Sequence, residues 1–99
     1  MTVTILIDLE TRQPARGEVM RLSKLLRSLA SHCPGYEGGI TWCDLGEGKM
    51  FLIAHHWQSM EQWHDFESDP RAAGLLVQLE GIAAKPAVIR GYTSDVDVS

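Results

Sequence analysis

The spacing of apolar residues switches repeatedly between the period of a strand and the period of a helix, and this limits the folds open to the chain. Near the N-terminus every second residue is apolar, at Val3, Ile5, Ile7 and Leu9. The spacing then becomes three and four residues, at Val19, Leu22, Leu26, Leu29 and Cys33. We therefore predict a strand over residues 3–9 and a helix over residues 15–32. The wet face of this helix is expected to carry Glu18, Arg21, Lys24, Arg27 and Ser31.

A hairpin is predicted in the middle of the chain. Residues 40–45 alternate in the manner of a strand, and "GEGK" at 46–49 supplies a glycine-bearing turn into the second strand, "MFLIAHHW" at 50–57. Successive side chains of a strand point to opposite faces, so the odd-numbered residues of the second strand share one face. Those residues include both a histidine and a tryptophan.

Two helical segments are expected after the hairpin. Ser59 offers a cap oxygen that Gln62 can answer in a capping box, and Asp69 before Pro70 marks a second helix start. A last strand is predicted over residues 87–96. The order β, α, β, β, α, β, with the second helix broken, is that of a ferredoxin-like α+β fold with a four-stranded antiparallel sheet.

Length, charge and the N-terminus limit the class of protein. We expect one domain over residues 1–99, with residues 97–99 as a frayed tail. The net charge of −4 is the wrong sign for a phosphate-backbone binder, so we expect no nucleic-acid partner. The opening "MTVTILIDLE" has neither a basic leader nor a long apolar run. We therefore expect a cytoplasmic protein without a membrane partner.

Apolar side chains fall on both faces of the predicted sheet, with Ile7 and Trp42 among them. Helices can cover only one of these faces in this fold. The other face would expose a larger apolar patch than soluble monomers usually carry. We therefore expect a homodimer that forms through the sheet.

The stretch "HHWQSMEQWHDFESDP", residues 55–70, concentrates histidine and aromatic side chains. His55 and Trp57 share one face of the predicted strand, and the following helix turns Trp63 and Phe66 inward. A histidine among aromatic walls is a candidate general base beside a flat substrate slot. The alternative is that these rings only fill the core, as large aromatics at helical spacing most often do.

A metal site is the competing enzyme hypothesis for the histidines. His55 and His56 are adjacent on a strand and so point to opposite faces, and no helix carries an HExxH motif. We therefore predict no metal site. A nucleophilic triad is not indicated either, because the chain has no Gly-x-Ser-x-Gly elbow.

Several motifs in order resemble the antibiotic biosynthesis monooxygenase family, over residues 3–96. They are "ETR" with "RGE", "PGYEG", a strand ending in Trp-x-Ser followed by Glu61 and Trp63, "SDPR", and the closing "AAKPAVIRGYTSDV". The resemblance implies a dimeric α+β barrel with a pocket between sheet and helices. Members oxidise phenols, quinols or polyketide-like aromatics with O2, many without a metal or flavin, and some relatives degrade haem.

The resemblance places Trp57 and Trp63 at the pocket, and the shared strand face of His55 and Trp57 makes His55 the candidate base. We expect His55 and Trp57 to be catalytic, with His55 as base and Trp57 as the family's pocket wall at the strand end. No cofactor is expected. Substrate contacts are expected from Trp63, Phe66, Ile53, Arg90 and Tyr92.

The chain departs from the family at one of these positions. Ile53 stands where some cofactor-free members have an asparagine, which removes one hydrogen-bond donor. The segment "AAGLLVQLE" lacks the axial histidine of haem-degrading relatives, so haem degradation is disfavoured. Two alternatives remain open: a non-catalytic barrel that binds a hydrophobic small molecule, and a surface ion pair as the role of Arg90.

Overall fold

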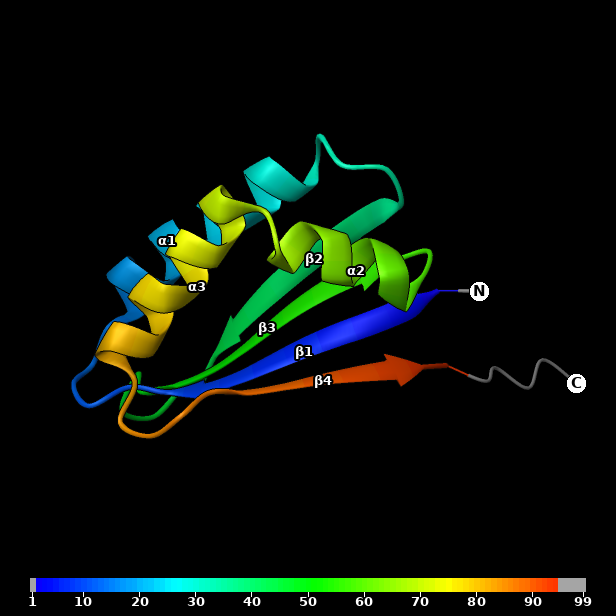
Figure 1. Ribbon diagram of the computed structural model, residues 1–99. Helices are drawn as coiled ribbons and strands as arrows, with labels where there is room; N and C mark the ends of the chain where they lie inside the picture. The colour runs from blue at the N-terminus through cyan, green and yellow to red at the C-terminus, as the bar shows by residue number, and fades with distance from the viewer. Residues whose placement is uncertain (1, 95–99) are drawn as a thin grey trace, which may run out of the picture.

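The computed structural model describes residues 2–94, which form one antiparallel sheet and three helices (Figure 1). The α+β ferredoxin-like class predicted from the sequence is confirmed. The elements in chain order are β1 (Val3–Glu10), α1 (Arg16–Ala30), β2 (Tyr36–Cys43), β3 (Met50–Trp57), α2 (Met60–Glu67), α3 (Pro70–Ile82) and β4 (Val88–Thr93).

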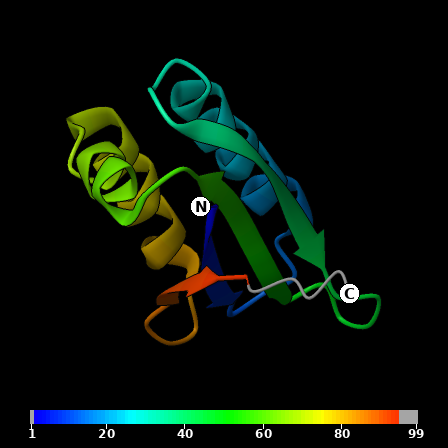
Figure 2. The same cartoon turned by 90° about the vertical axis from the view of Figure 1, so that its right-hand side faces the viewer.

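The four strands lie in the order β2-β3-β1-β4, so β1 and β3 are central and β2 and β4 are edges. In the register of the sheet, Ile5 and Gly39 both lie opposite His55. Ile7 lies between Ile53 and Ile89. All three helices lie on one face of the sheet and leave the other face open (Figures 1 and 2).

The core lies between the sheet and the helices. Alternate residues of β1 and β3 meet the apolar stripes of the helices there, because a strand with one covered face buries every second side chain. Burying each large apolar side chain contributes roughly 1.5–3 kcal/mol. The fully buried members include Ile5, Leu9, Val19, Leu22, Leu26, Phe51, Ile53, Trp57, Trp63 and Leu79.

The helix boundaries differ slightly from the prediction. Ala15, expected inside α1, is its N-cap, and the helix ends at Ala30 rather than at His32. The backbone N–H of His32 bonds to the carbonyl of Leu29, which tightens the last turn. Gly35, with φ of 87°, then reverses the chain in a conformation that disfavours other residues.

The first residues of β2 were missed from the sequence, because β2 begins at Tyr36 rather than at Ile40. Its two glycines read as a loop, since glycine has low strand propensity. A register shift between Tyr36 and Gly38 lets these residues pair with the end of β3. The bulge therefore brings Tyr36 next to the end of the central strand.

The predicted helix caps are confirmed except in one detail. Ser59 Oγ accepts from the backbone N–H of Gln62 at 3.3 Å, and Asp69 Oδ1 accepts from that of Arg71 at 2.9 Å, with Pro70 in the first turn of α3. The Gln62 side chain does not complete the capping box through its oxygen, because Oε1 has no hydrogen-bond partner.

A single carboxylate organises the turn between β2 and β3. Asp44 accepts hydrogen bonds from the backbone N–H groups of Gly46, Gly48, Lys49 and Met50, at 2.9–3.3 Å. These bonds hold the pKa of Asp44 below its ordinary value, the bond from Met50 having the largest effect. The turn therefore fixes where β3 begins.

The last strand is described as β4, Val88–Thr93, whereas residues 87–96 were predicted. Residues 95 and 96, and the tail expected over 97–99, lie outside the described residues. Within the described part of the chain, no helix has the length and apolar content needed to cross a membrane.

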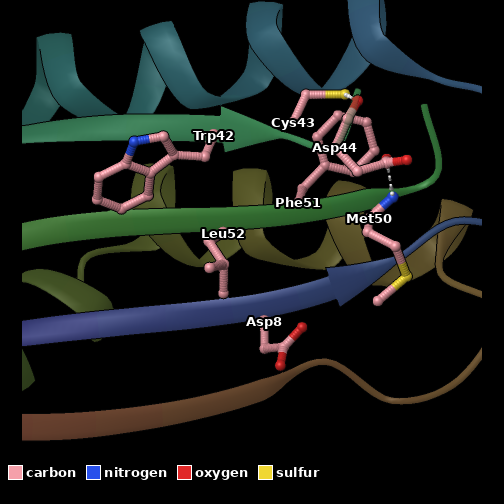
Figure 3. A pocket seen from close by; sticks show the side chains of 7 residues that line it. All are labelled: Asp8, Trp42, Cys43, Asp44, Met50, Phe51 and Leu52. Atoms are coloured by element: carbon pink, nitrogen blue, oxygen red, sulfur yellow. Dashed lines mark hydrogen bonds between the residues drawn. The ribbon is translucent and has the colours of Figure 1, made fainter. Parts of the chain in front are cut away.

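The open face of the sheet carries several large apolar side chains. Trp42 is 48% exposed and Leu52 is 40% exposed, and Ile40, Met50, Val88 and Tyr92 are exposed to a similar degree. Figure 3 shows Asp8, Trp42 and Leu52 around a hollow of about 320 Å³ on this face. One face of the molecule is thus apolar and uncovered.

We predict that Asp44→Ala lowers the thermal midpoint by a few degrees, because four backbone donors lose their acceptor. The folded-state pKa is depressed, so this stabilisation is present above about pH 4 and is lost as the pH falls through that lowered pKa. Calorimetry of both proteins from pH 7 to pH 2.5 measures this. Glu47→Ala, a neighbouring acid in the same turn, is the control. Equal midpoints at pH 7 would contradict the structural role.

Candidate active site

Five rings converge between the sheet and α2, and we call them the aromatic cluster. β3 directs His55 and Trp57 to its helix-covered face, and α2 turns its two inward aromatics toward them, as predicted. The bulged start of β2 adds a fifth ring, Tyr36, which residue spacing does not predict. The aromatic cluster consists of Tyr36, His55, Trp57, Trp63 and Phe66.

The imidazole of His55 lies next to each of the other four rings of this cluster. Its ring centroid is 5.4 Å from that of Tyr36 and 6.0 Å from those of Trp63 and Phe66. Trp57 lies 6.5 Å away in a stacked orientation, with an interplanar angle of 28°. The rings therefore form walls around the imidazole on several sides.

His55 is 1% exposed, and neither ring nitrogen has a hydrogen-bond partner. The indole Nε1 of Trp57, a fully buried residue, is also without one. Each unpaired buried polar group costs about 1–3 kcal/mol. Packing alone would favour an apolar residue over His55, so the histidine is not explained as core filler.

The environment keeps His55 neutral at pH 7. Burial has the largest effect, and together with the nearby positive charge of Arg27 and the neighbouring His56 it lowers the pKa of His55 from 6.5 to about 4. The neutral ring has one N–H donor and one acceptor nitrogen. Buried among aromatic walls, it can receive a proton from a ligand and donate a hydrogen bond to it.

Arg27 was predicted on the wet face of its helix, and this was wrong. Its side chain is half-buried and reaches the sheet, where Nη1 donates to Thr41 Oγ1 at 3.1 Å. Burial raises the pKa of Tyr36, and the charge of Arg27 opposes that shift. Arg27 thus places a positive charge close to both the phenol of Tyr36 and His55.

Gly39 makes room for Tyr36 beside His55. A Cβ atom at Gly39 would lie 2.9 Å from the Tyr36 hydroxyl oxygen and 2.5 Å from the carbonyl oxygen of Ala54. The hydroxyl group ends a side chain that can shift, but the carbonyl of Ala54 is backbone and cannot swing away. Glycine is therefore required here by the close approach of β3, and its missing side chain also leaves room for Tyr36.

The rings fill the space between them, so the hollow expected among His55, Trp57 and Trp63 is closed. None of five hollows on the described part of the chain is lined by these three side chains. One hollow of about 150 Å³ does share a residue with the aromatic cluster, because Phe66 forms part of its wall. A ligand of His55 must therefore displace a side chain.

The structure separates Arg90 and Tyr92 from His55. They lie on the open face of the sheet, where they line a small hollow of about 100 Å³ together with Asp8. The sheet stands between that hollow and the aromatic cluster. Ile53 does lie on the helix-covered face, but it is 1% exposed and packs within the core.

The remaining histidines of the stretch make their own local contacts. His56 faces the open side, as predicted, with Nδ1 2.9 Å from Thr4 Oγ1. His64 is exposed and lies 2.9 Å from Glu67 Oε1. Among residues 2–94, no three His, Cys, Asp or Glu side chains are grouped closely enough to hold a metal ion.

Three contributors to this site were missed from the sequence. Tyr36 is expected only as part of the "PGYEG" motif, Arg27 is expected on the wet face of its helix, and Gln62, which precedes Phe66 by one turn of α2, is expected only at a helix cap. The bulge in β2 and the long side chains of Arg27 and Gln62 decide where these groups lie, and residue spacing specifies neither. The one usable signal in the sequence is that Tyr36, an aromatic residue, lies shortly before the strand predicted over residues 40–45.

The chain is similar to known proteins in structure and not in sequence. No family model matches the chain in sequence, and no curated protein does. Rv0793 from Mycobacterium tuberculosis has a TM-score of 0.80 and 13% identity, with all of both chains covered. SnoaB, a cofactor-independent oxygenase from Streptomyces nogalater, has a TM-score of 0.84 and 10% identity, covering 98% of this chain and 96% of that one.

A third structure is described as an antibiotic biosynthesis monooxygenase. It is 10% identical, with a TM-score of 0.81, and the match covers 95% of this chain and 99% of the other. The two chains therefore share their architecture over nearly their whole lengths. The chain has the fold of the antibiotic biosynthesis monooxygenases, as the motifs had suggested.

Proposed function

We propose that this protein is a cofactor-independent monooxygenase that oxidises a small phenolic, quinol or polyketide-like aromatic with O2. One observation carries the proposal: a neutral histidine, 1% exposed and with both ring nitrogens unpartnered, lies inside a cluster of aromatic rings. The same fold supports this type of reaction in SnoaB, a cofactor-independent oxygenase.

His55 is proposed as the base that ionises the substrate. A simple phenol has a pKa near 10, so proton transfer to an imidazole of pKa about 4 is uphill by roughly 8 kcal/mol. Attraction between the resulting ions, about 4 kcal/mol at 4 Å, offsets roughly half of this. Substrates more acidic than phenol, such as polycyclic hydroxyaromatics, fit this base best.

The electrons for oxygen reduction come from the ionised substrate itself. The anion passes one electron to O2, and the radical and superoxide combine to form a carbon–oxygen bond. The peroxide takes back the proton held on His55. Loss of water then converts a ring CH2 to a carbonyl, with one oxygen atom in the product and one in water. Trp57, Trp63 and Phe66 supply flat walls for the rings.

The protein is also proposed to form a homodimer through the open face of its sheet. The large side chains on that face are 40–48% exposed, and a second copy would cover them. Contiguous exposed apolar patches of this kind mark association surfaces. On this proposal Arg90 and Tyr92 contact the partner subunit instead of a substrate at His55.

Oxygen uptake tests the reaction. Chelator-treated protein is expected to accelerate O2 consumption by at least one member of an anthrone and hydroquinone panel. His55→Ala is expected to lower kcat by about 10²–10⁴, the range typical of a general base. His64→Ala, an exposed histidine, serves as the control and should retain activity. Wild-type protein that accelerates no panel member over buffer would contradict the proposal.

Stability against pH tests the state of His55 independently. Its pKa is lower in the folded state, so the unfolded chain binds the extra proton between pH 6.5 and pH 4. Folding stability conferred by neutral His55 is therefore full above pH 6.5 and decreases as the pH falls to 4. Relative to His55→Leu, the wild-type free energy of unfolding should drop by roughly 3 kcal/mol over this range. Urea titrations that give parallel curves would show that His55 is not buried as described.

Sedimentation velocity tests the dimer. Trp42→Asp places a charge in the open face and is expected to give a monomer with an unchanged circular dichroism spectrum. Val77→Asp makes the same kind of change at a 69% exposed site on α3 and should leave the dimer intact. A monomeric wild type at micromolar concentration would rule out the proposed association.

A further inference from the structure

The side chain of Phe66 lies between His55 and the surface hollow of about 150 Å³. The hollow lies between the turn that follows α1, at Cys33 and Pro34, and the helix α2 with Asp69, the N-cap of α3. Three residues of α2, Gln62, Asp65 and Phe66, form part of its lining. Of the five hollows described above, this one alone shares a residue with the aromatic cluster.

Phe66 is the shared residue. Its ring centroid lies 5.2 Å from that of Trp57 and 6.0 Å from that of His55, while the same side chain borders the hollow. Movement of this one ring would therefore join the hollow to the imidazole. A hollow of about 150 Å³ has the size that admits a single benzene-sized ring.

Gln62 lines the same hollow beside Phe66. A Cβ atom at Gly35 would lie only 2.0 Å from Gln62 Oε1 and 2.2 Å from its Cδ, so the amide rests directly on the glycine backbone. Oε1 is buried and has no hydrogen-bond partner. The closed position thus leaves an acceptor unpaired, which is costly and favours a ligand that donates to it.

Carboxylates stand around the same hollow. Asp65 and Asp69 both line it, and Asp69 is paired with Arg71 at 3.1 Å. Because Arg71 offsets the charge of Asp69, the net negative charge comes from Asp65, and it disfavours the approach of a phenolate while it tolerates the neutral phenol. The ligand therefore has to bind as the neutral phenol and to ionise afterwards. The base available for this step is His55, on the helix-covered face of β3.

We infer that this hollow is the access site for a neutral hydroxylated aromatic, and that Gln62 Oε1 accepts the hydrogen bond of its hydroxyl group while the ring displaces Phe66. The inference rests on the proposed function, because it treats His55 as the destination of the ligand. Beyond that function, it assigns Gln62 as a binding residue and the neutral form as the state in which the ligand binds.

Chemical modification of the whole protein tests whether Gln62 and Phe66 restrict access to His55. Diethyl pyrocarbonate reacts with neutral imidazole, and mass spectrometry reports His55 alongside the exposed His64 as an internal reference. At pH 6 we expect Gln62→Ala to raise the rate at His55 at least tenfold with the rate at His64 unchanged. Gln78→Ala, an exposed glutamine on α3, should change neither rate. An unaltered His55 rate in Gln62→Ala would overturn the inference.

Binding of phenol and toluene tests the hydrogen bond. In titrations followed by amide NMR, phenol is expected to shift the side-chain amide of Gln62 and the Trp57 indole signal, and not the amide of Gln78. Gln62→Met keeps the length of the side chain and removes the acceptor. It should weaken phenol binding roughly threefold to tenfold and leave toluene binding unchanged. Equal effects on both ligands would overturn the role of Gln62.

The outcomes separate this inference from the reaction. If both Gln62 experiments succeed and no substrate consumes oxygen, the access site stands and the monooxygenase proposal fails. If the wild type oxidises substrates while Gln62→Ala leaves His55 protected, the reaction stands and this access site is wrong.

Discussion

The central strand β3 is the constraint on which both surfaces of the protein depend. Its neighbours β1 and β2 pair with it on either side, so its backbone is fixed along its length. Its odd-numbered side chains then enter the core with His55 among them, and Leu52 and His56 face the open side. The covered site and the uncovered apolar face both arise because successive side chains of this one strand point to opposite faces of the sheet.

The elements could be predicted because their signals are local. Apolar periodicity indicates β1 and α1, the glycine-bearing turn before residue 50 indicates β3, and Ser59 and Asp69 identify the starts of α2 and α3. The start of β2 could not be read, because glycines conceal a strand and a bulge depends on pairing with a distant segment. The residues at the start of β2 are strand residues because they pair with the end of β3, and their own sequence does not indicate a strand.

The candidate site was predictable only in part, for a related reason. Strand alternation placed His55 and Trp57 together, and helical spacing added Trp63 and Phe66. Arg90 and Tyr92 were grouped with them through a resemblance, and the parity of β4 puts them on the other face. Side-chain rotamers decide the positions of Arg27 and Gln62, and residue spacing does not specify a rotamer.

The Asp44 turn has a consequence beyond its own stability. Four N–H bonds to one carboxylate set the residue at which β3 resumes pairing. Because side chains alternate strictly, a one-residue insertion or deletion that slipped this start would move the imidazole to the opposite face and bring its neighbour inward. Natural length variation in this hairpin should therefore be confined to changes that preserve the parity of the strand, however far the loop lies from the aromatic rings.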